Sequence, residues 1–289
     1  MKDSQPLYSQ TNRFLGARSR LQRGGFCLLG VPLDLTVSYR PGTRRGPQAI
    51  RQASHVLEEF SLYQEQDLKE VPFFDLGDLI LPAGGLQRSL AVIRTAVAEL
   101  AQAGCIPFIL GGEHLLTLPA VEALVAAHGP DLALLQFDAH ADLRCQYEGE
   151  TLSHATVMRR LAQVVAPANI YQFGIRSATA AELAYARTHT NFYPFEVLEP
   201  LGQVCPLLAN RPLYLTIDID VFDPAFAPGV GTPEPGGQTI STMLAALKLL
   251  RGLNIIGVDI VEVCPPFDPS ERTAVLAAWL VRELLLLWG

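Results

Sequence analysis

Two carboxylates alternate around an imidazole in the segment Asp138-Ala139-His140-Ala141-Asp142. The segment directly follows an apolar run from residue 132 to 137, so it falls where a buried strand would end. Aspartate oxygens and a histidine nitrogen gathered at one point suit a divalent metal ion such as Mn²⁺ or Zn²⁺. A solvated loop after a strand could carry the same residues, so this segment by itself is only a candidate metal site.

Three further segments also place acidic or imidazole groups just after an apolar run. They are Gly111-Gly112-Glu113-His114, Asp218-Ile219-Asp220 and Asp259-Ile260-Val261-Glu262. In an open parallel α/β sheet the carboxyl ends of the strands share one crevice, and ligands bind there. We therefore expect the four strand ends to face one another. Carboxylates that lie so close repel, and a cation would offset the repulsion.

The candidate metal ligands in these segments are two imidazoles and four carboxylates, namely His114, Asp138, His140, Asp142, Asp218 and Asp220. One ion cannot use all six comfortably, whereas two ions about 3.5–4 Å apart can, if carboxylates and a water bridge them. Such a pair would lower the pKa of that water and make hydroxide available near neutral pH. The oxygen-rich set favours Mn²⁺ over Zn²⁺, because structural zinc sites use thiolates and no cysteine falls in these segments.

The elements that would position these residues can be predicted from periodicity. Apolar runs alternate with stretches of helical periodicity, which predicts βαβ units and a mainly parallel sheet in a single α/β domain over residues 1–289. We expect about eight strands, at residues 26–31, 71–76, 106–110, 132–137, 169–173, 191–193, 213–217 and 254–260. Helices should fill the gaps, at residues 46–60, 86–103, 115–127, 154–165, 178–188, 195–208, 241–250 and 270–287.

The composition indicates a globular protein with an acidic balance. Hydrophobic residues make up 49% and charged residues 18%, which excludes a disordered chain. The formal charge of −7, without a dense Lys/Arg run, argues against nucleic acid or a membrane as a partner and is compatible with a small cationic substrate.

Three further features predict a cytoplasmic protein. The 5 cysteines are odd in number and widely spaced, so a disulfide framework is not expected. Residues 1–10 lack the apolar core of a signal peptide. The apolar stretch from 274 to 288 is interrupted by Arg282 and Glu283 and is too short to span a bilayer, so we expect a buried C-terminal helix there.

The four segments, together with Asp-Pro at 223 to 224, fall in the order and approximate spacing of a known family. The chain resembles the ureohydrolases, the arginase and agmatinase superfamily of binuclear manganese amidinohydrolases. The resemblance covers nearly the whole chain, and four coordinated motifs are far more specific than one. It implies a three-layer α/β/α fold, two Mn²⁺ ions per subunit and a homo-oligomer, either a trimer or a hexamer.

The resemblance also implies which residues hold each ion. One manganese would be bound by His114, Asp138, Asp142 and Asp218, and the other by Asp138, His140, Asp218 and Asp220. Asp138 and Asp218 would bridge the two ions.

Three residues would serve the reaction itself. The family's guanidinium anchor falls on Glu262, whose carboxylate could form a charge-assisted, bidentate pair with the substrate. His154 matches the family's proton-shuttling histidine. The alternative is a purely structural role, as a helix-terminal histidine capped by Ser153. Hydroxide would attack the guanidinium carbon, Asp142 would relay the proton to the leaving amine, and urea would remain. Asp259 is expected to be structural.

The loop from 143 to 153 should select the substrate. It lacks the Asn- and Ser-rich pattern with which arginases bind an α-carboxylate, and it supplies Glu148 and Glu150, which would favour a terminal ammonium. It resembles the bacterial agmatinase branch, which implies hydrolysis of agmatine to putrescine and urea. Arg144 could instead bind the carboxylate of 4-guanidinobutyrate or formiminoglutamate, and arginine is a further alternative.

Departures from the common agmatinase pattern at Glu113, Ala155 and Val230 leave the side-chain selectivity open. An alternative of another class is an inactive oligomeric metal-binding scaffold, against which the intact ligand set argues.

Overall fold

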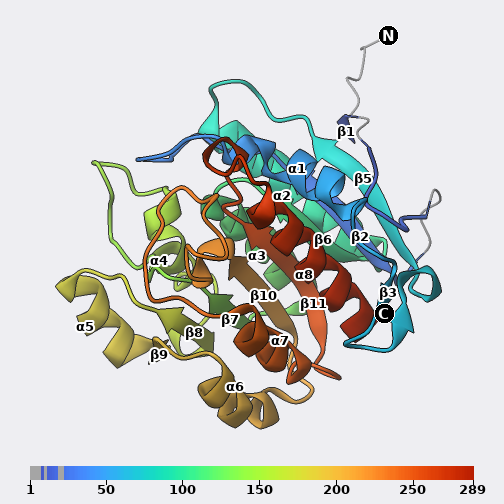
Figure 1. The fold of residues 1–289 in the computed structure, drawn as a ribbon. Coiled ribbons are helices and arrows are strands. Elements are labelled where there is room, and N and C mark those ends of the chain that lie inside the picture. Colours follow the sequence, from blue (N-terminus) through green and yellow to red (C-terminus); the bar gives the residue numbers. More distant parts are fainter. Residues whose placement is uncertain (1–7, 10–11, 19–22) are drawn as a thin grey trace.

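A mainly parallel sheet of nine strands forms the centre of the protein (Figure 1). The computed structural model describes residues 8–9, 12–18 and 23–289. Along the sheet the strand order is β1-β5-β2-β6-β11-β10-β7-β8-β9, and only the β1–β5 pair is antiparallel among these described strands. The bounds are Tyr8–Ser9 (β1), Phe26–Val31 (β2), Phe73–Leu79 (β5), Ile106–Gly111 (β6), Ala133–Phe137 (β7), Ile170–Ile175 (β8), Asn191–Pro194 (β9), Leu213–Asp218 (β10) and Ile255–Val261 (β11).

The central strands are apolar along their whole length because both faces of the sheet are covered. Every residue of β2, β7, β10 and β11 is buried. Continuous apolar runs of this kind are typical of parallel sheets packed between helices. All eight expected strands are present. The two-residue edge strand β1 is additional, and it is too short to produce a sequence pattern.

Helices cover both faces of the sheet and make the fold a three-layer α/β/α sandwich (Figure 1). The helices α1, α6, α7 and α8 pack with one core cluster, and α2, α3, α4 and α5 pack with the other. Their bounds are Gly46–Ser54 (α1), Leu86–Gln102 (α2), Thr117–His128 (α3), Val157–Leu161 (α4), Ala180–His189 (α5), Leu198–Val204 (α6), Ile240–Lys248 (α7) and Arg272–Trp288 (α8). The expected fold class is therefore confirmed.

The first expected helix, at residues 46–60, ends earlier than its pattern predicts. Helix α1 stops at Ser54, and Phe60–Ser61 (β3) pairs with Gln66–Asp67 (β4) in a small separate hairpin. The Ser61 hydroxyl donates a hydrogen bond of 2.9 Å to Glu283 in α8. This contact joins residues far apart in the chain, so local periodicity could not reveal it.

Two other expected helices are also shorter. The segment 154–165 contains only α4, preceded by the 3-10 turn His154–Thr156 that Ser153 caps. Helix α6 gives way to a second 3-10 turn, Cys205–Leu208, which contains Pro206. Proline lacks the amide hydrogen that would continue an α-helix.

The expected C-terminal helix is present as α8, and most of its side chains are buried, including the adjacent Arg282 and Glu283. The Arg282 guanidinium bonds the Glu283 carboxylate at 2.6 Å, so the two charges offset each other in the core. Within the described part of the chain, no helix combines the length and apolar character needed to cross a membrane.

Candidate active site

The four segments that carry acidic or imidazole groups lie at the ends of four neighbouring strands in the middle of the sheet. These strands, in spatial order, are β6, β11, β10 and β7. His114 follows β6, Asp138 follows β7, Asp218 ends β10 and Glu262 follows β11. The expectation that the four strand ends meet is thus confirmed by the topology.

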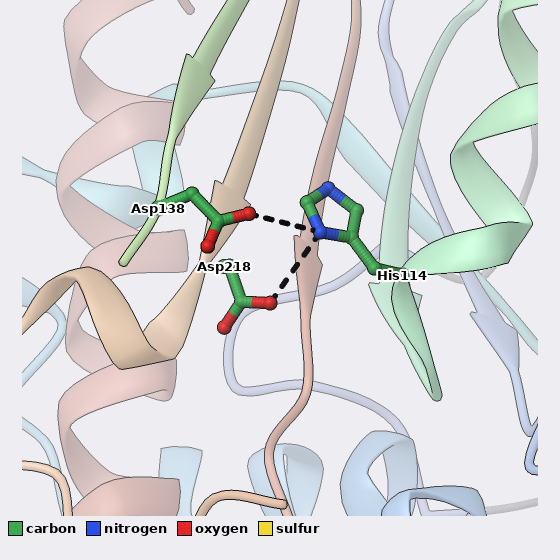
Figure 2. Close-up of side chains that lie close together, drawn as sticks. All are labelled: His114, Asp138 and Asp218. Atoms are coloured by element: carbon green, nitrogen blue, oxygen red, sulfur yellow. Dashed lines mark ion pairs between the residues drawn. The ribbon is translucent and has the colours of Figure 1, made fainter. Parts of the chain in front are cut away.

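The ring of His114 lies at the centre of this arrangement. Its Nδ1 atom is 3.1 Å from Asp138 Oδ2, 3.2 Å from Asp142 Oδ2 and 3.4 Å from Asp218 Oδ2. Figure 2 shows this nitrogen facing the Asp138 and Asp218 carboxylates. All four side chains are buried, so three anionic groups and one imidazole are enclosed together.

A hydrogen-bond chain on the other side of the ring fixes the tautomer of His114. Its Nε2 atom lies 2.9 Å from the Thr216 hydroxyl oxygen, and that hydroxyl donates to Asp259 Oδ1 at 2.5 Å. Because a hydroxyl has one hydrogen to donate, Thr216 must accept from Nε2–H. In the neutral ring, the Nδ1 atom, which has no well-formed hydrogen bond among the described residues, would therefore carry the lone pair on the side of the carboxylates. This tautomer is the one that ligates a metal ion.

The charges around His114 favour a cation at the same point. Burial lowers the pKa of His114, but the Asp138, Asp142 and Asp218 carboxylates outweigh it and hold the pKa well above its usual value. Burial and the Asp138 charge in turn raise the pKa of Asp142 to about 6. A proton or a metal ion beside Nδ1 would relieve both effects, and a metal ion competes with protons for such ligands. The residues therefore fit a bound metal ion.

A second group of potential ligands adjoins the first. His140 Nδ1 lies 2.9 Å from Asp220 Oδ2 and 3.7 Å from Asp138 Oδ1. Ligand atoms within 4.8 Å of one another define two sets, His114 with Asp138 and Asp218, and Asp138 with His140 and Asp220. Asp138 belongs to both sets, whereas Asp218 belongs to one. All six expected ligands are thus brought together, and their division between two ions stays a prediction.

Backbone amides hold three of these carboxylates in place. Asp138 Oδ1 accepts from the His140 amide at 2.6 Å, and Asp218 Oδ1 accepts from the Asp220 amide at 2.9 Å. Asp220 Oδ1 accepts from the Ala139 amide at 3.0 Å. Because each of these oxygens is committed to the backbone, the remaining carboxylate oxygens are oriented toward the centre of the site.

Two residues of the site have an unusual backbone conformation. Asp142 has φ of 53° and Glu262 has φ of 66°, the left-handed region that residues with a Cβ seldom adopt. Such conformations cost of order 1–3 kcal/mol and are concentrated at functional sites. The fold therefore accepts strain to aim these two carboxylates.

Asp259 supports the site without lining it. Its carboxylate is fully buried and accepts hydrogen bonds from Thr117 at 2.8 Å, Tyr214 at 2.7 Å and Thr216 at 2.5 Å. This agrees with the structural role expected for it. Through Thr216 the carboxylate also orients His114.

A cavity of about 260 Å³ opens over the ligand cluster. The expected functional residues that line it are His114, His140, Asp142, Arg144, His154, Asp218 and Glu262. Glu262 is buried, and its Oε1 accepts from the His114 amide at 2.8 Å. Burial, assisted by the Glu113 and Asp220 charges, raises the pKa of Glu262 to about 8. A cation in the cavity would counter this rise and favour the carboxylate.

His154 reaches the cavity from the 3-10 turn that precedes α4. Its ring Nδ1 lies 3.3 Å from the Ser153 hydroxyl and 3.4 Å from that of Thr36, and the Tyr147 ring packs edge-on at 5.6 Å. Burial, with the charges of His140, His114 and Arg144, lowers the pKa of His154 to about 4. At neutral pH the ring is therefore uncharged and able to accept a proton. His154 therefore both lies at a helical turn capped by Ser153 and lines the cavity, so the two alternatives raised from the sequence are compatible.

Arg144 lines the cavity but is already engaged by protein groups. Its Nε lies 3.6 Å from Glu182 Oε2, and its guanidinium carbon lies 4.9 Å over the Tyr147 ring. Glu182 lines the same cavity and also caps α5. The positive charge in this part of the cavity is thus offset by a neighbouring carboxylate.

Glu148 and Glu150 lie elsewhere on the loop. Both are exposed, and they line a neighbouring hollow with Thr36 and Leu152, which is separate from the cavity over the ligands. The structure therefore does not bring these two carboxylates together with the metal ligands.

Comparison with known proteins identifies the family. The sequence model of the arginase family matches residues 25–287. The chain belongs to the arginase family. It is 48% identical over 276 residues to the agmatinase of Bacillus subtilis, covering 94% of this chain and 95% of that protein. It is 47% identical over 278 residues to the agmatinase of Bacillus anthracis, covering 95% and 96%.

A solved structure supports the same assignment. The agmatine ureohydrolase of Thermoplasma volcanium aligns with a TM-score of 0.86 at 30% identity, covering 96% of this chain and 94% of that one. The resemblance inferred from the four motifs is therefore confirmed for this arginase-family chain.

Sequence reasoning missed Thr216 and Glu182 in this arginase-family site. A signal existed for Thr216, since residues two apart in a strand share one face and Thr216 precedes Asp218 by two. A weaker signal existed for Glu182, because Thr179 and Glu182 have the spacing of a capping box that starts a helix. Neither signal predicts contact with the site.

The tautomer of His114 makes a testable difference to metal binding. Thr216→Val removes the hydroxyl that accepts from Nε2–H, so manganese affinity should fall about ten- to a hundredfold, the usual effect of losing such a partner. Manganese retained per subunit, measured after dialysis against graded chelator, checks this. Thr216→Ser keeps the hydroxyl and should bind as the wild type does. Unchanged affinity in Thr216→Val would show that the hydrogen-bond chain does not support the ligand.

Proposed function

We propose that this protein is an agmatinase, a hydrolase that splits a C–N bond of the guanidinium of agmatine to give putrescine and urea. One observation carries the proposal: the buried carboxylate of Glu262 lines the same cavity as residues of both ligand sets. A guanidinium held by Glu262 would place its central carbon beside the cluster. The similarity to bacterial agmatinases over nearly the whole chain supports this choice.

The ligand cluster would hold two manganese ions. We assign His114, Asp138, Asp142 and Asp218 to one ion and Asp138, His140, Asp218 and Asp220 to the other. When bound, the ions lower the pKa of a water molecule and so supply a nucleophile near neutral pH. The oxygen-rich donor set supports Mn²⁺ over Zn²⁺.

Glu262 would orient the substrate. Its Oε1 already accepts from the His114 amide, and its Oε2 lies toward Gly231, where an added Cβ would be 3.5 Å away. A charge-assisted pair between this carboxylate and a guanidinium would fix the plane of the guanidinium. The cationic substrate would also stabilise the ionised form of Glu262.

His154 and Asp142 would move protons. The neutral ring of His154 can accept a proton and donate it to the leaving amine at the mouth of the cavity. Asp142, next to His114 at 3.2 Å, would relay a proton from the nucleophile toward the same amine.

Part of the cavity lining is apolar or aromatic and could contact an alkyl chain. Ala141, Ala155, Ala178 and Tyr147 belong to this part of the lining, and the charge of Arg144 is offset by Glu182. These features support agmatine over substrates with a terminal carboxylate. We propose that Glu148 and Glu150 act from outside the cavity, by attracting the cationic substrate to its entrance.

We further propose a homo-oligomer of three or six subunits and a cytoplasmic location, with neither nucleic acid nor membrane as a partner. The net charge of −7 supports a cationic small-molecule substrate.

A substrate panel tests the function directly. With manganese added, urea release should be fastest from agmatine and much slower from arginine and 4-guanidinobutyrate, and release of formamide from formiminoglutamate should be minor. Faster turnover of 4-guanidinobutyrate would show that Arg144 serves a substrate carboxylate. Absence of turnover with every guanidino compound would favour the inactive metal-binding scaffold.

Glu262→Gln should separate substrate orientation from metal binding. The amide keeps the shape of the side chain but cannot form the charged pair, so kcat/KM for agmatine should fall roughly a hundredfold or more while manganese content stays at the wild-type level. Steady-state kinetics and metal analysis check both points. Glu199→Gln, an exposed position on α6, is the matched control. Retained activity in Glu262→Gln would mean that another group anchors the guanidinium.

The exposed carboxylates should act only through long-range attraction. In the double variant Glu148→Gln/Glu150→Gln, KM for agmatine should rise a few-fold at low salt with kcat unchanged, because rim charges steer encounter. The difference should shrink at about 0.5 M salt, where the Debye length is only a few Å. Kinetics at two salt concentrations measure this. A rise in KM that persists at high salt would point to direct contact with the substrate.

A further inference from the structure

The loop after β2 touches the active site at Thr36, a residue outside all the motifs. The Thr36 Oγ1 atom accepts the backbone N–H of His154 at 3.0 Å and lies 3.4 Å from the ring Nδ1 of the same residue. The two residues are 118 positions apart in the chain. The first backbone amide of the 3-10 turn that carries His154 is thus bound by a residue from a distant segment of the chain.

Glu113 holds Thr36 in this position. Its Oε2 accepts from the backbone amides of Leu35 at 3.2 Å and Thr36 at 2.8 Å. Glu113 is fully buried and does not line the cavity, and apart from its charge acting on Glu262 it has been given no part in the chemistry. A buried carboxylate that accepts two hydrogen bonds from one loop is suited to fixing that loop.

The backbone around Glu113 leaves little freedom to either segment. The Glu113 amide donates to Leu33 O at 2.8 Å, and the Gly112 amide donates to Val31 O at 2.9 Å. A Cβ at Gly112 would lie 2.0 Å from Leu33 O, so only glycine permits this approach. The start of the loop is therefore held against the residues that follow β6 by hydrogen bonds. These contacts restrict the position of Thr36, three residues after Leu33.

We propose that Thr36, held by Glu113, is a positioning residue for His154. The bond to the His154 amide fixes the start of the 3-10 turn and hence the direction of the ring. The hydroxyls of Thr36 and Ser153 flank Nδ1, which leaves Nε2 as the ring nitrogen available to the cavity. The inference rests on the proposed function only in assigning His154 a proton-transfer role.

The test compares Thr36→Val, which is nearly isosteric but lacks the hydroxyl, with Thr36→Ser, which keeps it. In Thr36→Val, kcat for agmatine should fall roughly ten- to a hundredfold, as expected when a reacting group is misplaced, with KM within about twofold. Thr36→Ser should restore kcat to within about threefold of the wild type. Manganese content should be equal in all three proteins.

The same substitution in a His154→Ala background distinguishes positioning from general destabilisation. If Thr36 acts through His154, Thr36→Val should reduce kcat no further once His154 is removed. An equal loss in both backgrounds, or no loss in either, would overturn the inference. Glu113→Ala should follow Thr36→Val, whereas Glu113→Gln, which retains an acceptor oxygen, should lose less activity.

A second measurement does not depend on turnover. Hydrogen exchange of the His154 amide, followed by mass spectrometry on peptides covering residues 150–158 of the manganese-loaded protein, should be faster in Thr36→Val and unchanged in Thr36→Ser. Wild-type exchange rates in Thr36→Val would overturn the inference. A wild-type protein that does not hydrolyse agmatine would refute the proposed function alone, because the exchange result still decides whether Thr36 holds His154.

Discussion

The rest of the site depends on the burial of several carboxylates around one imidazole at the ends of four neighbouring strands. Asp138, Asp142 and Asp218 lie within 3.4 Å of His114 Nδ1, and all four side chains are buried. Anions at such distances repel strongly where water cannot screen them. The arrangement is stable only with positive charge among the carboxylates, and this requirement explains why an arginase-family fold binds metal at this edge of its sheet.

The strands themselves provide the precision that such a site needs. The hydrogen-bond chain from His114 through Thr216 to Asp259 runs between β10 and β11, both of which are fully buried. Groups that orient a ligand are effective when packing locks their own conformations. The strained backbone conformations of Asp142 and Glu262 also depend on the strands, because such conformations persist only where the surrounding structure holds them.

The loops contribute the groups that face the substrate, and each loop is tied down by a buried carboxylate. Glu182 accepts the Leu143 amide at 3.0 Å and lies beside Arg144, so it anchors the loop that follows Asp142. Glu113 does the same for the loop that carries Thr36. Both carboxylates act on segments far from them in sequence.

Much of this protein could be predicted from its sequence, because the relevant signals are local. Periodicity located all eight longer strands of the sheet, and three of the four motifs after them supplied the six expected ligands that the structure brings together. Tertiary structure alone decided the rest. Thr36 meets His154 across 118 residues and Ser61 meets Glu283 across 222, and hydrogen bonds over such separations leave no pattern in either local segment. The path of the 143–153 loop likewise places Arg144 beside Glu182 of α5 and leaves Glu148 and Glu150 outside the cavity, because contacts with segments distant in sequence, not loop composition, set this path.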